Sequence, residues 1–145
     1  MPSALTPLGV SALALLAERP MHPYEMYQLL LERWEDRVVK VRPGSLYHTV
    51  DRLAGQGYLR ATGTRRAGNR PERTTYEITG EGRAILLGHL RELLAVPVNE
   101  YPRFPLALSE AHNLPRQTVI ELCGQRLGLL RGEAERLDRG IHQAG

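Results

Sequence analysis

The chain has 145 residues, of which 42% are hydrophobic and 24% are charged, a composition typical of a soluble folded protein and not of a disordered one. A single cysteine excludes an intramolecular disulfide, and the longest apolar stretch, residues 8–17, is too short to span a bilayer. The formal net charge is +3 and the pI is about 9.3. We therefore expect a cytoplasmic protein that does not contact a membrane.

Two amphipathic helices are predicted at the start of the chain. The first spans residues 3–18, and Pro20 ends it. The residues of its apolar face recur at helical spacing and are Leu5, Leu8, Ala12, Leu15 and Leu16. The second helix begins at Pro23, a favourable first-turn position for proline, and runs to about Trp34. His22, just before it, is expected to act as a cap or a packing residue.

A third helix is predicted from Ser45 to Gln56 because Leu46, Val50 and Leu53 form a buried stripe at helical spacing. Its polar side chains follow the spacing i, i+3, i+4, i+7, i+11, and they are Ser45, His48, Thr49, Arg52 and Gln56. Two readings of this stripe stay open. It is the solvated side of an ordinary surface helix, or it is a surface that binds another molecule.

A basic β-hairpin is predicted after the third helix. Two strand-like runs, residues 58–63 and 73–79, are joined by a turn segment that contains Gly68. Within residues 60–73 only Glu72 offsets five arginines, which are Arg60, Arg65, Arg66, Arg70 and Arg73. A local cluster of this kind is a candidate phosphate-binding surface, although a solvated loop has the same composition.

The remaining chain is predicted to be helical. Thr79 suits the N-cap of a fourth helix that ends before Pro97, and a short helical piece is expected around residues 106–112. A long helix over residues 115–141 carries apolar residues spaced 3, 4, 3, 4, which are Leu127, Leu130, Ala134, Leu137 and Ile141. Four glycines lower the intrinsic helicity of this segment, so we expect it to need a partner surface.

The order helix, helix, helix, hairpin is typical of a winged helix-turn-helix. The expected fold class is mainly α with a small β-hairpin. A DNA-binding domain over residues 1–80 is followed by a helical dimerisation and effector region over residues 81–145. In this architecture the third helix, residues 45–56, enters the major groove and the wing, residues 60–78, contacts the DNA backbone. Arg52 then suits guanine, and Gln56 suits adenine. The first-turn N–H groups near Ser45 suit a phosphate.

Three segments together resemble the PadR family of transcriptional regulators. They are LTPLGVSALALLAERPMHPYEMYQLL, RPGSLYHTVDRLAGQGYL and RTTYEITGEGRAIL, and the resemblance covers about residues 5–95. It implies a homodimeric winged-helix repressor that binds an inverted-repeat operator and is released by a small-molecule effector. Tyr24 and Tyr47 match tyrosines of the family's motifs, which implies phenols near the DNA backbone. His48 stands where many members have proline.

These arguments give three sets of candidate residues. The DNA-binding set consists of Tyr24, Ser45, Tyr47, His48, Thr49, Arg52, Gln56, Arg65, Arg66, Arg70 and Arg73. The dimerisation set consists of Leu86, Leu90, Leu93, Leu127, Leu130 and Leu137. A possible effector pocket consists of Trp34, Tyr101 and Phe104, although ordinary packing of these rings is the open alternative.

Other function classes have weaker support in the sequence. The five histidines are scattered, there is no HExxH motif, and there is no cysteine pair for zinc, so we expect no enzyme, no metal site and no cofactor. Cys123 is expected to be a packed thiol and not a redox sensor. The main alternative is a winged helix that binds another protein without reading a DNA sequence.

Overall fold

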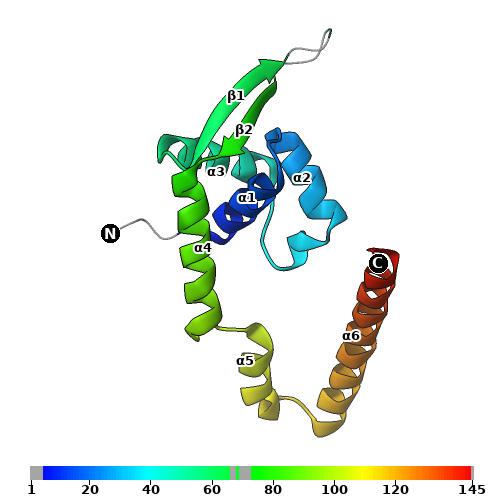
Figure 1. The fold of residues 1–145 in the computed structure, drawn as a ribbon. Helices are drawn as coiled ribbons and strands as arrows, with labels where there is room; N and C mark the ends of the chain where they lie inside the picture. Colours follow the sequence, from blue (N-terminus) through cyan, green and yellow to red (C-terminus); the bar gives the residue numbers. More distant parts are fainter. Residues whose placement is uncertain (1–4, 66–67, 69–72, 145) are drawn as a thin grey trace. The chain divides into compact units, whose positions relative to one another are not determined.

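The computed structural model describes residues 5–65, 68 and 73–144 (Figure 1). The chain forms two compact units, Met1–Pro97 and Val98–Gly145. We expected a boundary after residue 80. By its contacts, however, the fourth helix belongs with the first unit, because it packs on the first helix. The functional division into a DNA-binding part and a dimerisation part stays a prediction.

The first unit is mainly helical with one antiparallel hairpin, which confirms the expected fold class. A 3₁₀ turn, η1 (Glu35–Arg37), follows the second helix. The other elements, in chain order, are α1 (Pro7–Glu18), α2 (Pro23–Glu32), α3 (Pro43–Gly55), β1 (Leu59–Arg65), β2 (Arg73–Ile78) and α4 (Gly80–Ala95).

Side-chain caps fix where the first two helices begin. The Oγ1 of Thr6 accepts a hydrogen bond from the Gly9 N–H at 3.1 Å, so α1 begins after Thr6 and not at residue 3. The Nδ1 of His22 accepts from the Tyr24 N–H at 2.9 Å, which confirms the expected cap of α2. At the other end α2 stops before Trp34, whose φ is +60° and whose side chain is 47% exposed.

The core lies where α1 packs against α3 and α4. Leu13 of α1 and Leu46 of α3 are fully buried. Leu86 of α4 joins the same cluster and is only 4% exposed. The structure therefore contradicts the dimerisation role predicted for Leu86, because the α4 face that carries it packs within its own unit. Leu90 is partly buried against the same cluster, whereas Leu93 is exposed.

The hairpin is tied to the helices at its base (Figure 1). Its strands pair in a register that runs from Leu59 opposite Ile78 to Arg65 opposite Arg73. Met21, in the link between α1 and α2, exchanges both backbone hydrogen bonds with Tyr76 of β2, each 3.1 Å long. The base of the wing is therefore held against the link between the first two helices.

A close junction joins the end of α3 to the start of α4. The Thr79 N–H donates to the Tyr58 carbonyl at 3.0 Å, and the Thr79 hydroxyl donates to the Gly57 carbonyl at 2.7 Å. The same hydroxyl oxygen accepts from the Gly82 N–H at 3.0 Å and so caps α4. A Cβ at Gly82 would lie 2.1 Å from the Tyr58 carbonyl oxygen, so only glycine permits this approach.

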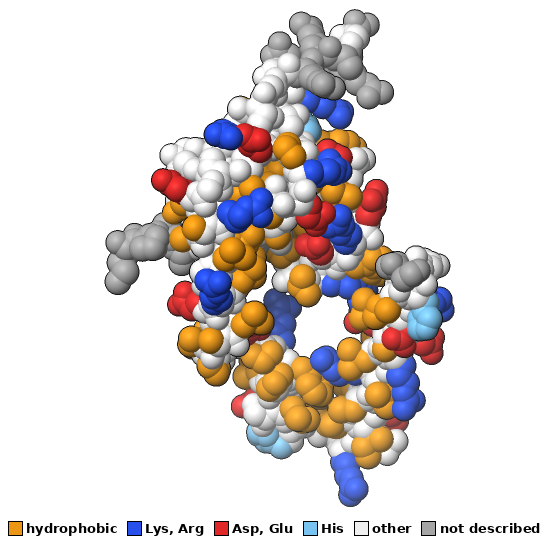
Figure 2. All heavy atoms as spheres, viewed as in Figure 1, with side chains coloured by type: hydrophobic (Ala, Val, Ile, Leu, Met, Phe, Trp, Pro, Cys, Tyr) orange, Lys and Arg blue, Asp and Glu red, His pale blue; other side chains and the backbone are white. Residues whose placement is uncertain are grey.

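The second unit contains α5 (Arg103–Ser109), the 3₁₀ turn η2 (Ala111–Asn113) and the long helix α6 (Arg116–Ala144). None of its described side chains is buried, and hydrophobic side chains lie at its surface (Figure 2). This unit therefore has no core of its own. In the part of the chain that the structure describes, no helix combines the length and apolar character that a membrane span requires.

Candidate nucleic-acid interface

The third helix has a wider buried face than the sequence pattern suggested. Thr49 is only 5% exposed and lies on the inward side with Leu46, Val50 and Leu53. The prediction that Thr49 belongs to the exposed polar stripe is therefore wrong. A side chain at this position cannot reach a base while α3 stays packed.

The exposed face of α3 is centred on His48 and on Asp51, a residue that the sequence stripe did not include. Tyr47 and Arg52 are also exposed, and at 100° per residue they flank this pair on opposite sides. Because Asp51 follows His48 by three residues, the two are neighbours on the helix surface. On a helix that buries Leu46 and Leu53, Asp51 lies on the opposite, exposed side. Helical spacing measured from these leucines would therefore have predicted the position of Asp51, whereas residue polarity alone did not.

The start of α3 is open to an anion. The helix begins at Pro43, two residues before the predicted Ser45, and Arg42 at the N-cap makes no side-chain cap hydrogen bond. The N–H groups of Gly44 and Ser45 lie in this uncapped first turn, where a helix is able to bind a phosphate. Gln56 lies at the opposite end, just past the last helical residue, and is exposed.

Arg52 makes a contact that the sequence did not indicate. Its guanidinium donates to the Oγ1 of Thr6 at 3.1 Å, and that hydroxyl also caps α1. The two residues are 46 positions apart in the chain. Arg52 thus bridges α3 to the start of α1 at the edge of the exposed face of α3.

Aromatic and basic side chains from three elements meet beside α3. The rings of His22 and Tyr47 are 6.1 Å apart in an edge-on arrangement, and the Arg73 guanidinium of β2 lies 5.3 Å from the ring centre of Tyr24. Burial, followed by the charge of Arg73, lowers the pKa of His22. A lowered pKa favours the neutral imidazole ring. A neutral ring is what the cap of α2 requires, because the Nδ1 of His22 accepts a hydrogen bond there.

A hollow of about 150 Å³ lies next to these rings. It is bounded by the start of α2, by α3 and by β2, and its walls are His22, Pro23, Tyr47, Asp51, Thr74 and Tyr76. Burial, and then the charge of Asp51, raise the pKa of the Tyr76 phenol. The base of the wing and the exposed face of α3 therefore line the same hollow.

The wing arginines are only partly within the described residues. Arg60 is ion-paired with Glu77 across the hairpin, and Arg73 stacks on Tyr24. The backbone of Arg65 lies in β1 directly opposite Arg73. The predicted contacts of Arg66 and Arg70 lie outside the described residues.

Comparison with known proteins identifies this architecture. Residues 12–87 match the family model described as "Transcriptional regulator PadR-like family". The chain belongs to the PadR-like family of transcriptional regulators. It is accordingly a regulator and not an enzyme, and the family resemblance seen in the sequence is confirmed. No curated protein sequence matches it.

Several solved structures share the fold. Bacillus subtilis PadR in complex with operator DNA has a TM-score of 0.78 and 19% identity, over 94% of this chain and 76% of that one. The same protein with p-coumaric acid has a TM-score of 0.68 and 17% identity, over 97% and 75%. The smu.1604c protein of Streptococcus mutans UA159 has a TM-score of 0.64 and 19% identity, over 92% and 77%.

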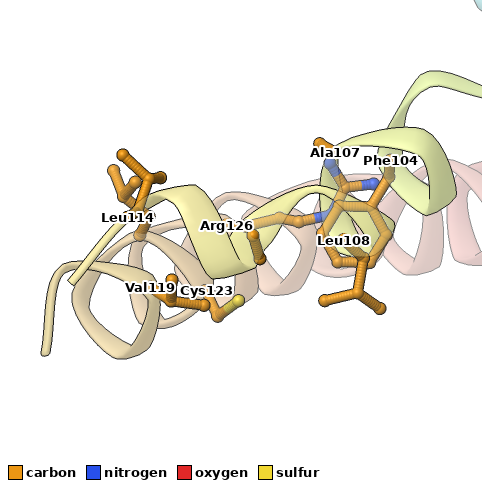
Figure 3. Close-up of a pocket in the computed structure, with 9 residues that line it drawn as sticks. Phe104, Ala107, Leu108, Leu114, Val119, Cys123 and Arg126 are labelled. Atoms are coloured by element: carbon orange, nitrogen blue, oxygen red, sulfur yellow. The ribbon is translucent and has the colours of Figure 1, made fainter. Parts of the chain in front are cut away.

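The second unit contains an apolar cavity of about 260 Å³ between α5 and α6 (Figure 3). Its walls include Phe104, Leu108, Cys123 and Arg126, and the Arg126 guanidinium lies 3.9 Å from the ring centre of Phe104. Cys123 is exposed at this wall, so the expectation of a packed thiol is wrong for this unit.

The three residues of the predicted effector pocket have different environments. Phe104 lines the cavity of the second unit, whereas Tyr101 of the same unit is largely exposed and is not among the lining residues. Trp34 belongs to the first unit, and Arg37 lies 5.3 Å from its ring centre. Of the three, Phe104 has the setting that suits a ligand site.

Proposed function

We propose that this chain is a homodimeric repressor that binds an inverted-repeat operator through α3 and the hairpin wing. The observation that carries the proposal is the geometry of α3. It buries Leu46, Val50 and Leu53 in its own unit and exposes His48 and Arg52 beside the aromatic and basic surface of the wing base. A similar fold, B. subtilis PadR, is seen in complex with operator DNA.

Dimerisation is supported by the state of the second unit. Its described residues form no core, and the seam residues Leu127, Leu130 and Leu137 are each about half exposed. An apolar helix face of this length is stable in water when a second copy covers it. Two copies related by a two-fold axis then read two half-sites of an inverted repeat.

An effector site is proposed at the cavity that Phe104 lines. B. subtilis PadR, which shares this fold, is also seen with p-coumaric acid. The cavity of this chain is apolar, with one guanidinium at its wall, and so suits a small, largely apolar molecule. As a regulator of gene expression, the protein is expected to act in the cytoplasm.

The proposal is tested by fluorescence anisotropy with a duplex from upstream of the protein's own gene. Wild type should bind this duplex more tightly than a scrambled one, with an affinity that falls as salt rises. Arg52→Ala should weaken binding by about 1–3 kcal/mol. The matched control, Arg91→Ala, removes another exposed arginine, from α4, and should bind like wild type.

The alternative, a winged helix that binds only other proteins, predicts a different result. The chain would then bind neither duplex at any salt concentration, and Arg52→Ala and Arg91→Ala would behave alike. Because Arg52 also contacts Thr6, the thermal midpoint of each variant is measured, so that a folding defect is not read as lost DNA contact.

A further inference from the structure

The exposed face of α3 carries a single carboxylate, Asp51, in a setting that otherwise suits a polyanion. Asp51 is exposed and makes no hydrogen bond or ion pair with any described residue. It shares the walls of the 150 Å³ hollow with Tyr47, Thr74 and Tyr76. Its neighbour along the helix surface is His48, which is also exposed. A base edge that His48 approaches therefore also lies near the Asp51 carboxylate.

A carboxylate at this place acts against DNA binding in general, because it repels backbone phosphates of every sequence alike. The repulsion is offset only where the carboxylate accepts a hydrogen bond, since an ionised carboxyl group has no proton to donate. In the major groove cytosine presents an amino donor, whereas guanine and thymine present acceptors. Adenine also has an amino group, but its N7 acceptor lies beside it. Cytosine is therefore the base that fits Asp51.

We propose that Asp51 is a specificity-determining residue that selects a cytosine at one position of each operator half-site. The inference rests on the proposed function, because it requires α3 to lie in the major groove. It adds a chemical reason for the carboxylate. Asp51 lowers affinity for DNA that lacks the cytosine and so widens the gap between operator and unrelated sequence.

The experiment uses the 145-residue chain and a pool of random-sequence duplexes, from which repeated binding and sequencing give the preferred half-site. Wild type should enrich one invariant cytosine, and replacing that base pair should weaken binding by about tenfold. Asp51→Asn should shift the preference at this position to adenine, because an amide pairs with the N6 and N7 of adenine. Asp51→Glu retains the acceptor and should keep the cytosine.

Asp36→Asn is the matched control, because it removes one exposed carboxylate from the η1 turn of the same unit. It should leave the base preference of every position unchanged. If Asp51→Asn selects the same half-site as wild type, the inference is overturned while the proposed function stands. If wild type enriches no sequence from the pool, the proposed function itself fails. Circular dichroism of both Asp51 variants confirms that each is folded.

Discussion

The sharpest stability prediction concerns Gly82, where α4 approaches the end of α3. In Gly82→Ala the new Cβ would lie 2.1 Å from the Tyr58 carbonyl oxygen and 2.9 Å from its carbon. Ordinary contacts of a Cβ lie between 3.4 and 4 Å, so the two segments must separate by more than about 1 Å. Neither obstacle is a flexible side chain, so the backbone itself has to move.

That movement breaks the hydrogen bonds at the junction. The Tyr58 carbonyl accepts from the Thr79 N–H, and the Thr79 hydroxyl caps α4 through the Gly82 N–H. Forced overpacking costs about 1–3 kcal/mol and loss of a cap costs about 1 kcal/mol. The higher helix propensity of alanine returns about 1 kcal/mol. The last two terms cancel, so we expect Gly82→Ala to lower the free energy of unfolding by about 1–3 kcal/mol.

The assay is urea denaturation followed by circular dichroism, at one fixed protein concentration because dimerisation would shift the midpoint. Gly80→Ala is the control. Gly80 lies two residues earlier in the same helix, and a Cβ added there would meet no heavy atom within 4 Å. Gly80→Ala has no overpacking to offset the higher helix propensity of alanine, so its free energy of unfolding should stay unchanged or rise by up to about 1 kcal/mol. Equal midpoints for the two variants would refute the close packing of α4 on Tyr58.

Three further predictions follow from the geometry beside α3 and from the second unit. Burial and Arg73 lower the pKa of His22 from 6.5, so the unfolded chain binds a proton more readily than the folded chain does. The contribution of His22 to the free energy of unfolding is therefore complete above pH 6.5, and it is lost as the pH falls through the pKa of the folded state. His22→Asn, which keeps a cap but does not titrate, should flatten this part of the profile in denaturant melts at successive pH values. Tyr24→Leu should weaken DNA binding by about threefold, because it removes about 0.5–1 kcal/mol of stacking under Arg73. Tyr24→Phe should retain the stacking and the affinity. Equal anisotropy titrations for the two variants would count against the stacking role. Leu130→Asp should convert the dimer into a monomer in sedimentation velocity, because it places a charge in the apolar seam of α6. Gln125→Asp, which lies outside the seam, should leave the dimer intact. A wild-type protein that sediments as a monomer would contradict the proposed dimer.

The order of elements could be read from the sequence because each helix and strand carries a local signal. Proline and cap residues mark the starts of α2 and α4, and apolar periodicity marks α3. The inward positions Leu46, Val50 and Leu53 of α3 were all predicted correctly. Local signals of this kind do not depend on which distant segment packs against the element, and so they survive folding unchanged.

The errors occur where residue type and helical position disagree. Thr49 is polar and was predicted to lie on the exposed face of α3. The buried face of this helix runs along about two turns, however, and it is wide enough to include Thr49. Leu86 is apolar and was assigned to a partner, but α4 needs apolar residues both for its own unit and for any second copy. A sequence pattern predicts that a leucine is buried, but it does not show which segment, of the same chain or of a second copy, covers that leucine.

Long-range contacts were beyond any local pattern. The bond from Arg52 to Thr6 and the approach of Gly82 to Tyr58 join segments that are 46 and 24 residues apart, and neither has a spacing signal. The Gly-x-Gly at the start of α4 does not fit a nucleotide-binding motif, and its second glycine is needed because a carbonyl oxygen occupies the space of a side chain.

The junction also bears on how the two proposed activities are connected. Two hydrogen bonds from Thr79, to the carbonyls of Gly57 and Tyr58, and the contact at Gly82 fix the start of α4 to the residues that follow α3, so the two helices are expected to move together. Inverted half-sites must be met at a fixed spacing of about one helical turn, roughly 34 Å. In a dimer whose contacts include the exposed part of α4, such as Leu93, a change in the angle of α4 would displace both copies of α3. A small tilt at the dimer contact is then sufficient to take the second recognition helix out of register with its half-site, with no change in any residue that contacts DNA.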